Sequence, residues 1–118
     1  MTNEPAEGMK FCIVIVPSGD GERLLNRMSE QGFPATRIGS TGGFLKRGSA
    51  TVFSALAAER VPELVALLHQ EFPEVTERMP VASLPFMDDM ETPSSAMIDV
   101  RVGGAVLFVL PLDRMERV

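Results

Sequence analysis

Three short segments in the first half of the chain carry the hydrophobic pattern of β-strands. Residues 11–16, FCIVIV, are apolar throughout and rich in β-branched side chains, which is typical of a central strand covered on both faces. Residues 34–40 alternate, with Thr36, Ile38 and Ser40 on one side, and residues 51–56 form a further apolar run. The pattern therefore predicts three strands, with the first at the centre of a sheet.

Two segments between these strands and the later part of the chain have the periodicity of amphipathic helices. The first follows strand 11–16, where Ser18 or Asp20 can cap its start and Gly32 stands where it stops. The second begins near Pro62, whose missing N–H has no intrahelical partner in a first turn, and ends at Pro73. Its core-facing stripe consists of Val61, Leu64, Val65, Leu68 and Phe72.

The last part of the chain has the pattern of a tight hairpin after a long loop. Residues 98–102 alternate between apolar and charged side chains, and residues 105–110 form an apolar run. Two such runs separated by Gly103 and Gly104 predict a hairpin. Residues 73–95 contain four prolines and several acidic residues, so we expect a long loop there.

The order of these elements predicts the fold class. Two β-α-β units of similar length indicate an α+β, ferredoxin-like fold, an antiparallel sheet with two helices on one face. We expect a single domain over residues 9–118, preceded by a flexible polar tail over residues 1–8. Because FCIVIV is apolar on both sides, the second face of the sheet also needs a cover. We expect another subunit to supply it, which predicts an oligomer.

Composition narrows the classes of function. The formal net charge of −5 argues against a general nucleic-acid binder, which needs an electropositive face. The apolar runs are far shorter than the roughly 20 residues of a membrane span, and the polar start does not have the pattern of a signal peptide. We therefore expect a cytoplasmic protein. The single cysteine, Cys12, cannot form an internal disulfide, and its apolar neighbours predict a buried thiol.

The titratable residues do not indicate an enzyme, a metal site or a resident cofactor. The one histidine, His69, lies off the apolar stripe of its helix, so a Ser/His/Asp arrangement cannot be assembled. Asp88, Asp89 and Glu91 have carboxylates for a hard cation. Calcium loops, however, place carboxylates at alternate positions around a glycine, so a solvated acidic loop is the favoured interpretation.

The stretch STGGFLKRGSAT, residues 40–51, contains the strongest candidate chemistry. Gly43 and Gly48 have the spacing of a phosphate-binding loop, but Ser49 and Ala50 stand where Lys and Ser or Thr are required, and a strand follows instead of a helix. One remaining interpretation is a simple turn. The other is a nucleotide site, in which glycines permit close backbone approach and an aromatic ring stacks on a base. Its residues are Thr36, Thr41, Gly42, Gly43, Phe44, Lys46, Arg47, Ser49 and Thr51.

Two segments, ATRIGSTGGFLKRGSAT and VRVGGAVLFVLPLDRMERV, closely resemble the cyclic-di-AMP receptor family, which are PII-like signalling proteins. The resemblance runs in order over residues 9–118. It implies a homotrimer without catalytic activity that binds cyclic-di-AMP in clefts between subunits, and whose ordered loops are then presented to a partner protein. The ligand-binding residues that it implies are Thr36, Thr41, Gly42, Gly43, Phe44, Leu45 and Phe108. Lys46, as a substitute cation, and Ser49 are further candidates in the same stretch.

Three positions depart from the family pattern. Pro34 stands where these receptors have Arg, and Gly32 and Ser49 stand where they have Asn. An Arg–phosphate hydrogen bond contributes about 1.5–3 kcal/mol, so these changes favour an alternative. In that alternative the chain is a PII-like trimeric interaction module that has lost cyclic-di-AMP binding or binds another nucleotide. The glycine-rich ATP segment of true PII proteins has no counterpart, because residues 73–95 contain no glycine.

Overall fold

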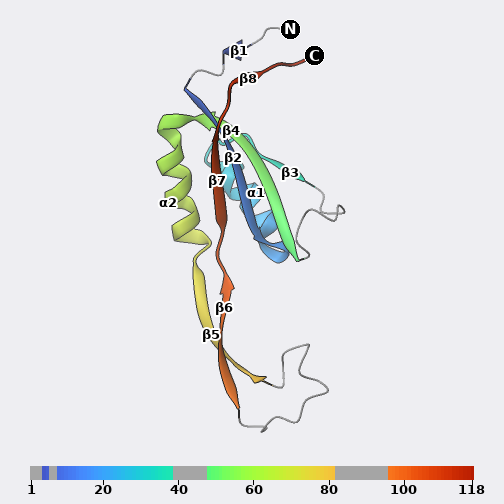
Figure 1. Ribbon diagram of the computed structural model, residues 1–118, viewed down its shortest axis with the longest axis vertical. Coiled ribbons are helices and arrows are strands. Elements are labelled where there is room, and N and C mark those ends of the chain that lie inside the picture. The colour runs from blue at the N-terminus through green and yellow to red at the C-terminus, as the bar shows by residue number, and fades with distance from the viewer. Residues whose placement is uncertain (1–3, 6–7, 39–47, 82–95) are drawn as a thin grey trace. The chain divides into compact units, whose positions relative to one another are not determined.

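The computed structural model describes residues 4–5, 8–38, 48–81 and 96–118 (Figure 1). The chain forms two compact units, the first made of residues 1–73 and 104–118 and the second of residues 74–103. Each unit is described by itself below. Among the described residues, no helix combines the length and apolarity needed to cross a membrane.

The first unit is built on an antiparallel sheet with the strand order β3-β4-β2-β7. Its strands are β2 (Met9–Pro17), β3 (Thr36–Ile38), β4 (Ser49–Ala57) and β7 (Val106–Pro111). The central strand β2 pairs with β4 from Met9↔Ala57 to Pro17↔Ser49, and with β7 from Lys10↔Pro111 to Ile15↔Val106. This confirms the central position that the uninterrupted apolar run predicted.

Two helices follow short 3-10 turns after the inner strands. The turn η1 (Ser18–Asp20) leads into α1 (Gly21–Glu30), and η2 (Ala58–Arg60) leads into α2 (Val61–Glu71). The side chain of Asp20, the residue before α1, makes no capping hydrogen bond, and Ser18 lies in the 3-10 turn. The predicted side-chain cap is therefore wrong, because the 3-10 turn itself leads the chain into the helix.

The end of α1 follows the prediction made for Gly32. This glycine has φ 80°, the left-handed region that a side chain disfavours. Its N–H donates to the Ser29 carbonyl at 3.0 Å, and the Phe33 N–H donates to the Met28 carbonyl at 2.8 Å. These two bonds satisfy carbonyls that a helix end leaves without partners, and they turn Phe33 back into the core.

Both helices pack on the same face of the sheet. Residues 12, 14 and 16 of β2 and residues 50, 52 and 56 of β4 share one buried cluster with Leu24 and Met28 of α1. The same cluster contains Leu64, Leu67, Leu68 and Phe72 from α2 and its C-terminal end. The α+β class and an antiparallel sheet with two helices are thus confirmed. The stripe predicted for the second helix is confirmed at Leu64, Leu68 and Phe72, with Val61 packed against the cluster, whereas Val65 is half-buried and lies outside it.

Two positions stand out where the helices pack on the sheet. Gly21 is buried where α1 begins, and a Cβ placed there would lie 2.6 Å from the Cβ of Ala50 in β4. Ser54 is 3 % exposed and its hydroxyl has no hydrogen-bond partner among the described residues. Cys12, opposite Ser54 in the sheet register, is fully buried as predicted, and this burial raises the pKa of its thiol.

The second unit is a two-stranded antiparallel ribbon of β5 (Glu74–Pro80) and β6 (Met97–Gly103). It corrects two expectations. Part of the predicted loop over residues 73–95 is strand β5, while residues 82–95 lie outside the described residues. The predicted hairpin is also wrong, because β6 pairs with β5 and the run over residues 105–110 pairs with β2 instead.

A short pairing joins residues near the two ends of the chain. Strand β1 (Glu4–Pro5) pairs antiparallel with β8 (Arg114–Met115), in the register Glu4↔Met115 and Pro5↔Arg114. Two residues of the predicted tail therefore have a strand partner. Residues 1–3 and 6–7 lie outside the described residues.

Candidate functional site

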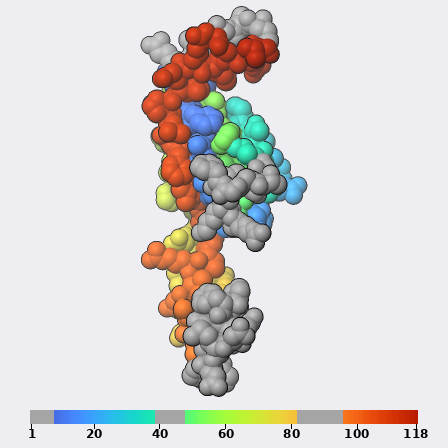
Figure 2. Space-filling view, turned by 45° about the vertical axis from the view of Figure 1, so that its right-hand side comes forward, coloured from blue at the N-terminus to red at the C-terminus, as the bar shows by residue number. Residues whose placement is uncertain are grey.

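The sheet has a second face, which points away from the helices and is strongly apolar. Odd-numbered residues of β2 and β4 point to this side, and the register adds alternate residues of β7. We call this surface the open face. Figure 2 looks onto it, with β7, β2, β4 and β3 side by side (red, blue, green and cyan). Its apolar residues include Phe11, Ile13, Ile15, Ile38, Phe53, Ala55, Val106, Phe108 and Leu110.

The side chains of the open face are only partly protected from water. Val106, Phe108 and Leu110 are 52 %, 50 % and 42 % exposed, although each faces an apolar residue of β2. Beside them, the rings of Phe11 and Phe53 pack edge to face with centroids 5.0 Å apart. A contiguous apolar surface of this kind on a small soluble domain typically marks an interaction site.

Three of the predicted ligand-binding residues lie on this face. Thr36 of β3 is exposed and lies opposite Phe53, and Ser49 at the start of β4 is half-buried. Phe108 lies on β7 opposite Ile13. The structure therefore brings Thr36, Ser49 and Phe108 to one surface, although they come from three different strands.

Thr36 and Phe108 stand at opposite edges of the sheet. The register aligns Thr36, Phe53, Ile13 and Phe108 in one row across the four strands. Three strand spacings of about 4.8 Å separate the two ends of the row by roughly 14 Å. A ligand in contact with both residues of one chain would have to lie across the rings and methyl groups between them.

The remaining predicted ligand-binding residues, Thr41, Gly42, Gly43, Phe44, Leu45 and Lys46, lie outside the described residues, as does Arg47. The described chain reaches this segment after Ile38, at the edge strand β3, and leaves it at Gly48. Gly48 has φ 80°, and its carbonyl accepts a 2.7 Å hydrogen bond from the Ser18 N–H. This bond holds Gly48, the residue before β4, beside the end of β2.

The described part of the open face has no charged side chain. Lys10 and Arg37 occupy the opposite parity of their strands, because Lys10 faces Leu56 and Arg37 faces Val52 on the helix side. The guanidinium of Arg37 lies near Gly21, at the start of α1. The described surface thus offers apolar contacts and the accessible hydroxyls of Thr36 and Ser49, because Thr51 on the same face is 3 % exposed. A cation for a phosphate would have to come from another part of the protein.

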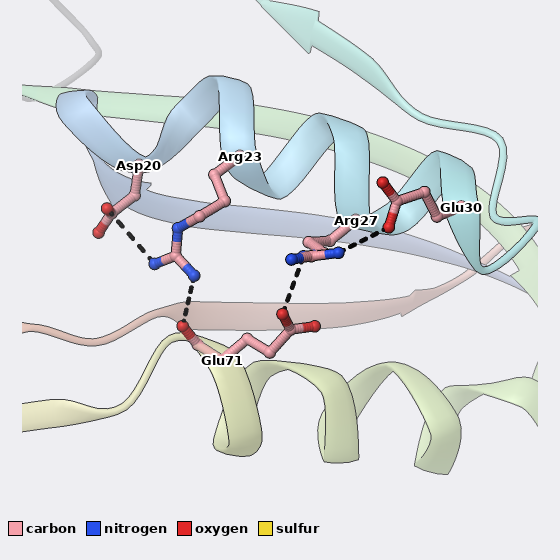
Figure 3. Close-up of polar contacts among 5 residues, drawn as sticks. All are labelled: Asp20, Arg23, Arg27, Glu30 and Glu71. Atoms are coloured by element: carbon pink, nitrogen blue, oxygen red, sulfur yellow. Dashed lines mark hydrogen bonds and ion pairs between the residues drawn. The ribbon is translucent and has the colours of Figure 1, made fainter.

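A second cluster of polar residues links the two helices and was not predicted from the sequence (Figure 3). Arg23 of α1 donates to the Glu71 carbonyl at 2.8 Å, and its guanidinium lies 4.1 Å from the centre of the Phe72 ring. Arg27 binds the Glu71 carboxylate, with Nε 2.9 Å from Oε1, and Glu30 at 2.8 Å. A cation at this end of α2 complements the partial negative charge of its carbonyls.

The start of α2 repeats this arrangement toward α1. Arg60 donates to the carbonyls of Gln31 at 2.7 Å and Gly32 at 3.3 Å, and lies 4.2 Å from the centre of the Phe33 ring. Its hydrogen bonds to Glu63 lower the pKa of that carboxyl and raise the pKa of the guanidinium. Charge pairs at i and i+3 in the sequence could have indicated the local bonds, but they do not reveal contacts between the helices.

A shallow hollow of about 420 Å³ runs along the outer side of α1. Its lining residues are Gly19, Glu22, Arg23, Asn26, Arg27 and Glu30. Both arginines are paired with carboxylates of Asp20, Glu30 or Glu71, so they hold the two helices together and are not free for an anion. We interpret this cluster as structural.

The other groups considered for catalysis or metal binding do not converge. His69 lies on the exposed side of α2, as the sequence predicted. Asp88, Asp89 and Glu91 lie outside the described residues. Among the described residues, no group of three or more His, Cys, Asp or Glu side chains is arranged to hold a metal ion.

The fold and the open face define a small α+β protein whose sheet presents an exposed apolar surface on the side opposite its helices. The chain belongs to the cyclic-di-AMP receptor family, whose model matches residues 9–118. It is also similar to a solved structure of a functionally unknown protein from Pediococcus pentosaceus ATCC 25745. That similarity has 32 % sequence identity and a TM-score of 0.65, and covers 93 % of this chain and 97 % of the other.

Proposed function

We propose that this protein is a PII-like signalling receptor that binds cyclic-di-AMP in clefts between the subunits of a homotrimer. Membership of the receptor family supports the ligand class. The observation that carries the intersubunit site is the position of Thr36 and Phe108 on one apolar face but at opposite edges of the sheet. In the proposed trimer the β7 edge of one sheet meets the β3 edge of its neighbour, so that Phe108 of one chain and Thr36 of the next line one cleft.

The exposed apolar side chains of the open face support the trimer. Phe108, Val106 and Leu110 gain a favourable burial free energy when another subunit covers them, at about 25 cal/mol per Å² of apolar surface. A cleft between such faces provides an apolar wall for an adenine ring, and Thr36 and Ser49 provide hydroxyls at its border. The segment that contains Phe44 and Lys46 follows β3 directly, so it borders the same cleft in this proposal.

The proposed mechanism is a binding event without bond making or breaking. Cyclic-di-AMP contacts Thr36, the backbone at Gly42 and Gly43, and the side chains of Phe44, Leu45, Lys46, Ser49 and Phe108. Occupation of the cleft orders the neighbouring segment and changes the surface that a regulated protein meets. We place this receptor in the cytoplasm, where it has no catalytic role.

Isothermal titration calorimetry tests the ligand. We expect saturable binding of cyclic-di-AMP and little or no heat with cyclic-di-GMP, ATP, ADP or AMP. Phe108→Ala and Phe44→Ala should each weaken binding at least tenfold. Val109→Ala is the matched control, because Val109 lies on the same strand with 42 % exposure but faces the helix side, opposite Cys12. Absence of heat with every nucleotide would reject the ligand and leave the fold unaffected.

Light scattering coupled to size-exclusion chromatography tests the oligomer. We expect a mass three times that of the 12.8 kDa chain, and a smaller species after Phe108→Asp. A monomeric wild-type protein would reject the intersubunit cleft. The circular dichroism spectrum of the variant distinguishes loss of assembly from loss of folding.

A second candidate function is a trimeric interaction module that has lost cyclic-di-AMP binding or binds another nucleotide. Three residues favour it: Pro34, which is exposed, Gly32, whose backbone ends α1, and Ser49. None of them has the guanidinium or amide found at that position in the family. A trimer that gives no heat with cyclic-di-AMP but retains a partner protein, with residues 73–95 required, would favour this candidate.

A further inference from the structure

The ribbon formed by β5 and β6 has two chemically different faces. Its antiparallel register places Thr76 opposite Arg101 and Arg78 opposite Asp99 on one side. On that side Arg78 lies 3.7 Å from Asp99, and Arg101 lies 3.7 Å from Glu74. This is the surface expected for a solvated two-stranded sheet, because each arginine has an acidic partner across the strands.

The other side of the ribbon is almost entirely apolar, and we call it the ribbon apolar face. Its three rows pair Val75 with Val102, Glu77 with Val100, and Met79 with Ile98. Val75 and Ile98 remain 47 % and 40 % exposed. A two-stranded ribbon has no core of its own beneath such a face, so its apolar side chains gain from an added partner surface.

Glu77 occupies the middle of this face. Its neighbours in the same row and in the rows on either side are apolar. Both arginines of the ribbon point to the opposite side, where they are paired with Asp99 and Glu74. The segment over residues 82–95 contains no lysine or arginine, so it has no cation for this carboxylate. Covering the face without a cation would bury an unpaired negative charge, which is strongly unfavourable.

We propose that the ribbon apolar face is the docking surface for a basic, apolar peptide segment of a partner protein. The partner's apolar side chains cover Val75, Val102, Met79 and Ile98, and one of its lysines or arginines pairs with Glu77. A second copy of the ribbon fits less well. Two such faces packed against each other would bring two Glu77 carboxylates into one apolar interface without a basic residue from either ribbon.

This inference concerns a surface of residues 74–103 and does not rest on nucleotide binding. It goes beyond the proposed function by stating the chemistry of the segment that a partner protein must present, namely apolar side chains and one lysine or arginine. Nucleotide binding and peptide docking are measured separately below, so the failure of one is distinguishable from the failure of the other.

Fluorescence anisotropy with the full chain tests the docking surface. The probes are a fluorescein-labelled amphipathic peptide of leucine and lysine, its leucine–glutamate counterpart, and a serine–lysine peptide of the same charge. We expect saturable binding of the leucine–lysine peptide and at least tenfold weaker binding of the other two. Val75→Thr, a nearly isosteric change that removes apolar surface, should weaken binding several-fold.

A matched pair of charge variants makes the test specific for one face. Glu77→Gln and Glu74→Gln change the net charge equally on the same strand, but only Glu77 lies on the ribbon apolar face. We expect Glu77→Gln to weaken the leucine–lysine peptide about tenfold and Glu74→Gln to leave its affinity within twofold. Glu77→Lys should transfer the preference to the leucine–glutamate peptide.

Three results would overturn the inference. The first is absence of binding by the leucine–lysine peptide, and the second is equal weakening by Glu74→Gln and Glu77→Gln, which would indicate general attraction to an acidic protein. The third is loss of a larger assembly on Val75→Thr, which would identify a second copy as the occupant. Calorimetry with cyclic-di-AMP on the same variants should give unchanged nucleotide binding, whichever outcome the peptides give.

Discussion

Replacing Gly21 by alanine tests how closely α1 approaches the sheet. The added Cβ would lie 2.6 Å from the Cβ of Ala50 and 2.9 Å from the Cζ of Arg37. Arg37 is exposed and its long side chain can move aside. Ala50 is 2 % exposed in the middle of the core, and its Cβ cannot move without its strand. Relief of the contact therefore requires α1 or β4 to shift.

The expected cost follows from two opposing effects. Overpacking of a filled core typically costs about 1–3 kcal/mol. Replacement of glycine by alanine also restricts the unfolded chain, which stabilises the fold by about 0.4–1 kcal/mol. We expect Gly21→Ala to lower the free energy of unfolding by about 1–2 kcal/mol. Gly19→Ala is the matched control, because a Cβ there meets no atom within 4 Å and should be neutral or slightly stabilising.

Urea denaturation followed by circular dichroism, at one chain concentration, measures these differences. The double variant Gly21→Ala with Ala50→Gly removes the atom against which the new Cβ packs. If the contact is the cause, the two changes should be coupled favourably by at least about 1 kcal/mol in a double-mutant cycle. Neutral surface substitutions change the free energy of unfolding by up to about 0.5 kcal/mol. A Gly21→Ala protein whose free energy of unfolding differs from that of the wild type by no more than this scatter would refute the close approach.

Three further predictions concern buried and paired side chains. Ser54→Ala should raise the free energy of unfolding by about 1 kcal/mol in the same assay, since it removes a buried hydroxyl without a described partner, whereas Ser49→Ala should not. The pKa of Glu63 is lowered in the folded state, so the ionised carboxylate stabilises the fold above its ordinary pKa, and this contribution is lost as the pH falls through the lowered pKa. Arg60→Gln should raise the pKa of Glu63 measured by NMR titration, and an unchanged pKa would contradict the pairing. The Cys12 thiol, buried and with a raised pKa, should react with a thiol reagent only on unfolding, so rapid reaction of the native protein would contradict its position.

Local patterns predicted the elements of the first unit well. The apolar run over residues 11–16, the stripe that includes Leu64 and Leu68, and the stop at Gly32 each correspond to a described element. These patterns depend on burial and backbone conformation within a few residues of the chain, which the sequence contains directly.

Pairing between distant segments was the part that local patterns could not supply. Gly103 and Gly104 both have positive φ, as a tight hairpin requires, yet the strands on either side pair elsewhere. The choice of pairing partner depends on the strand that each run meets in the folded chain. Strand β5 was not expected, because charged residues interrupt its alternation and it ends in a proline. The arginines that link α1 and α2 escaped prediction for the same reason.

The candidate site was predicted in part. The family motifs selected Thr36 and Phe108, Ser49 was a candidate in the same stretch, and the structure brings these three to the open face. Residue spacing alone could not show that Thr36 and Phe108 lie at opposite edges of the sheet. That separation depends on the strand order, and it supports a ligand site between subunits, which the family resemblance had implied.

The position of β7 beside β2 has a consequence for folding kinetics. β2 and β7 lie far apart in the sequence, so their pairing closes a long loop before the sheet is complete, and pairings of this kind fold slowly. Until β7 arrives, β2 presents an unpaired edge of Ile13, Val14 and Ile15 that is suited to pairing with any extended chain. We expect β7 to join late, and refolding at high chain concentration to lose material to aggregation during that interval.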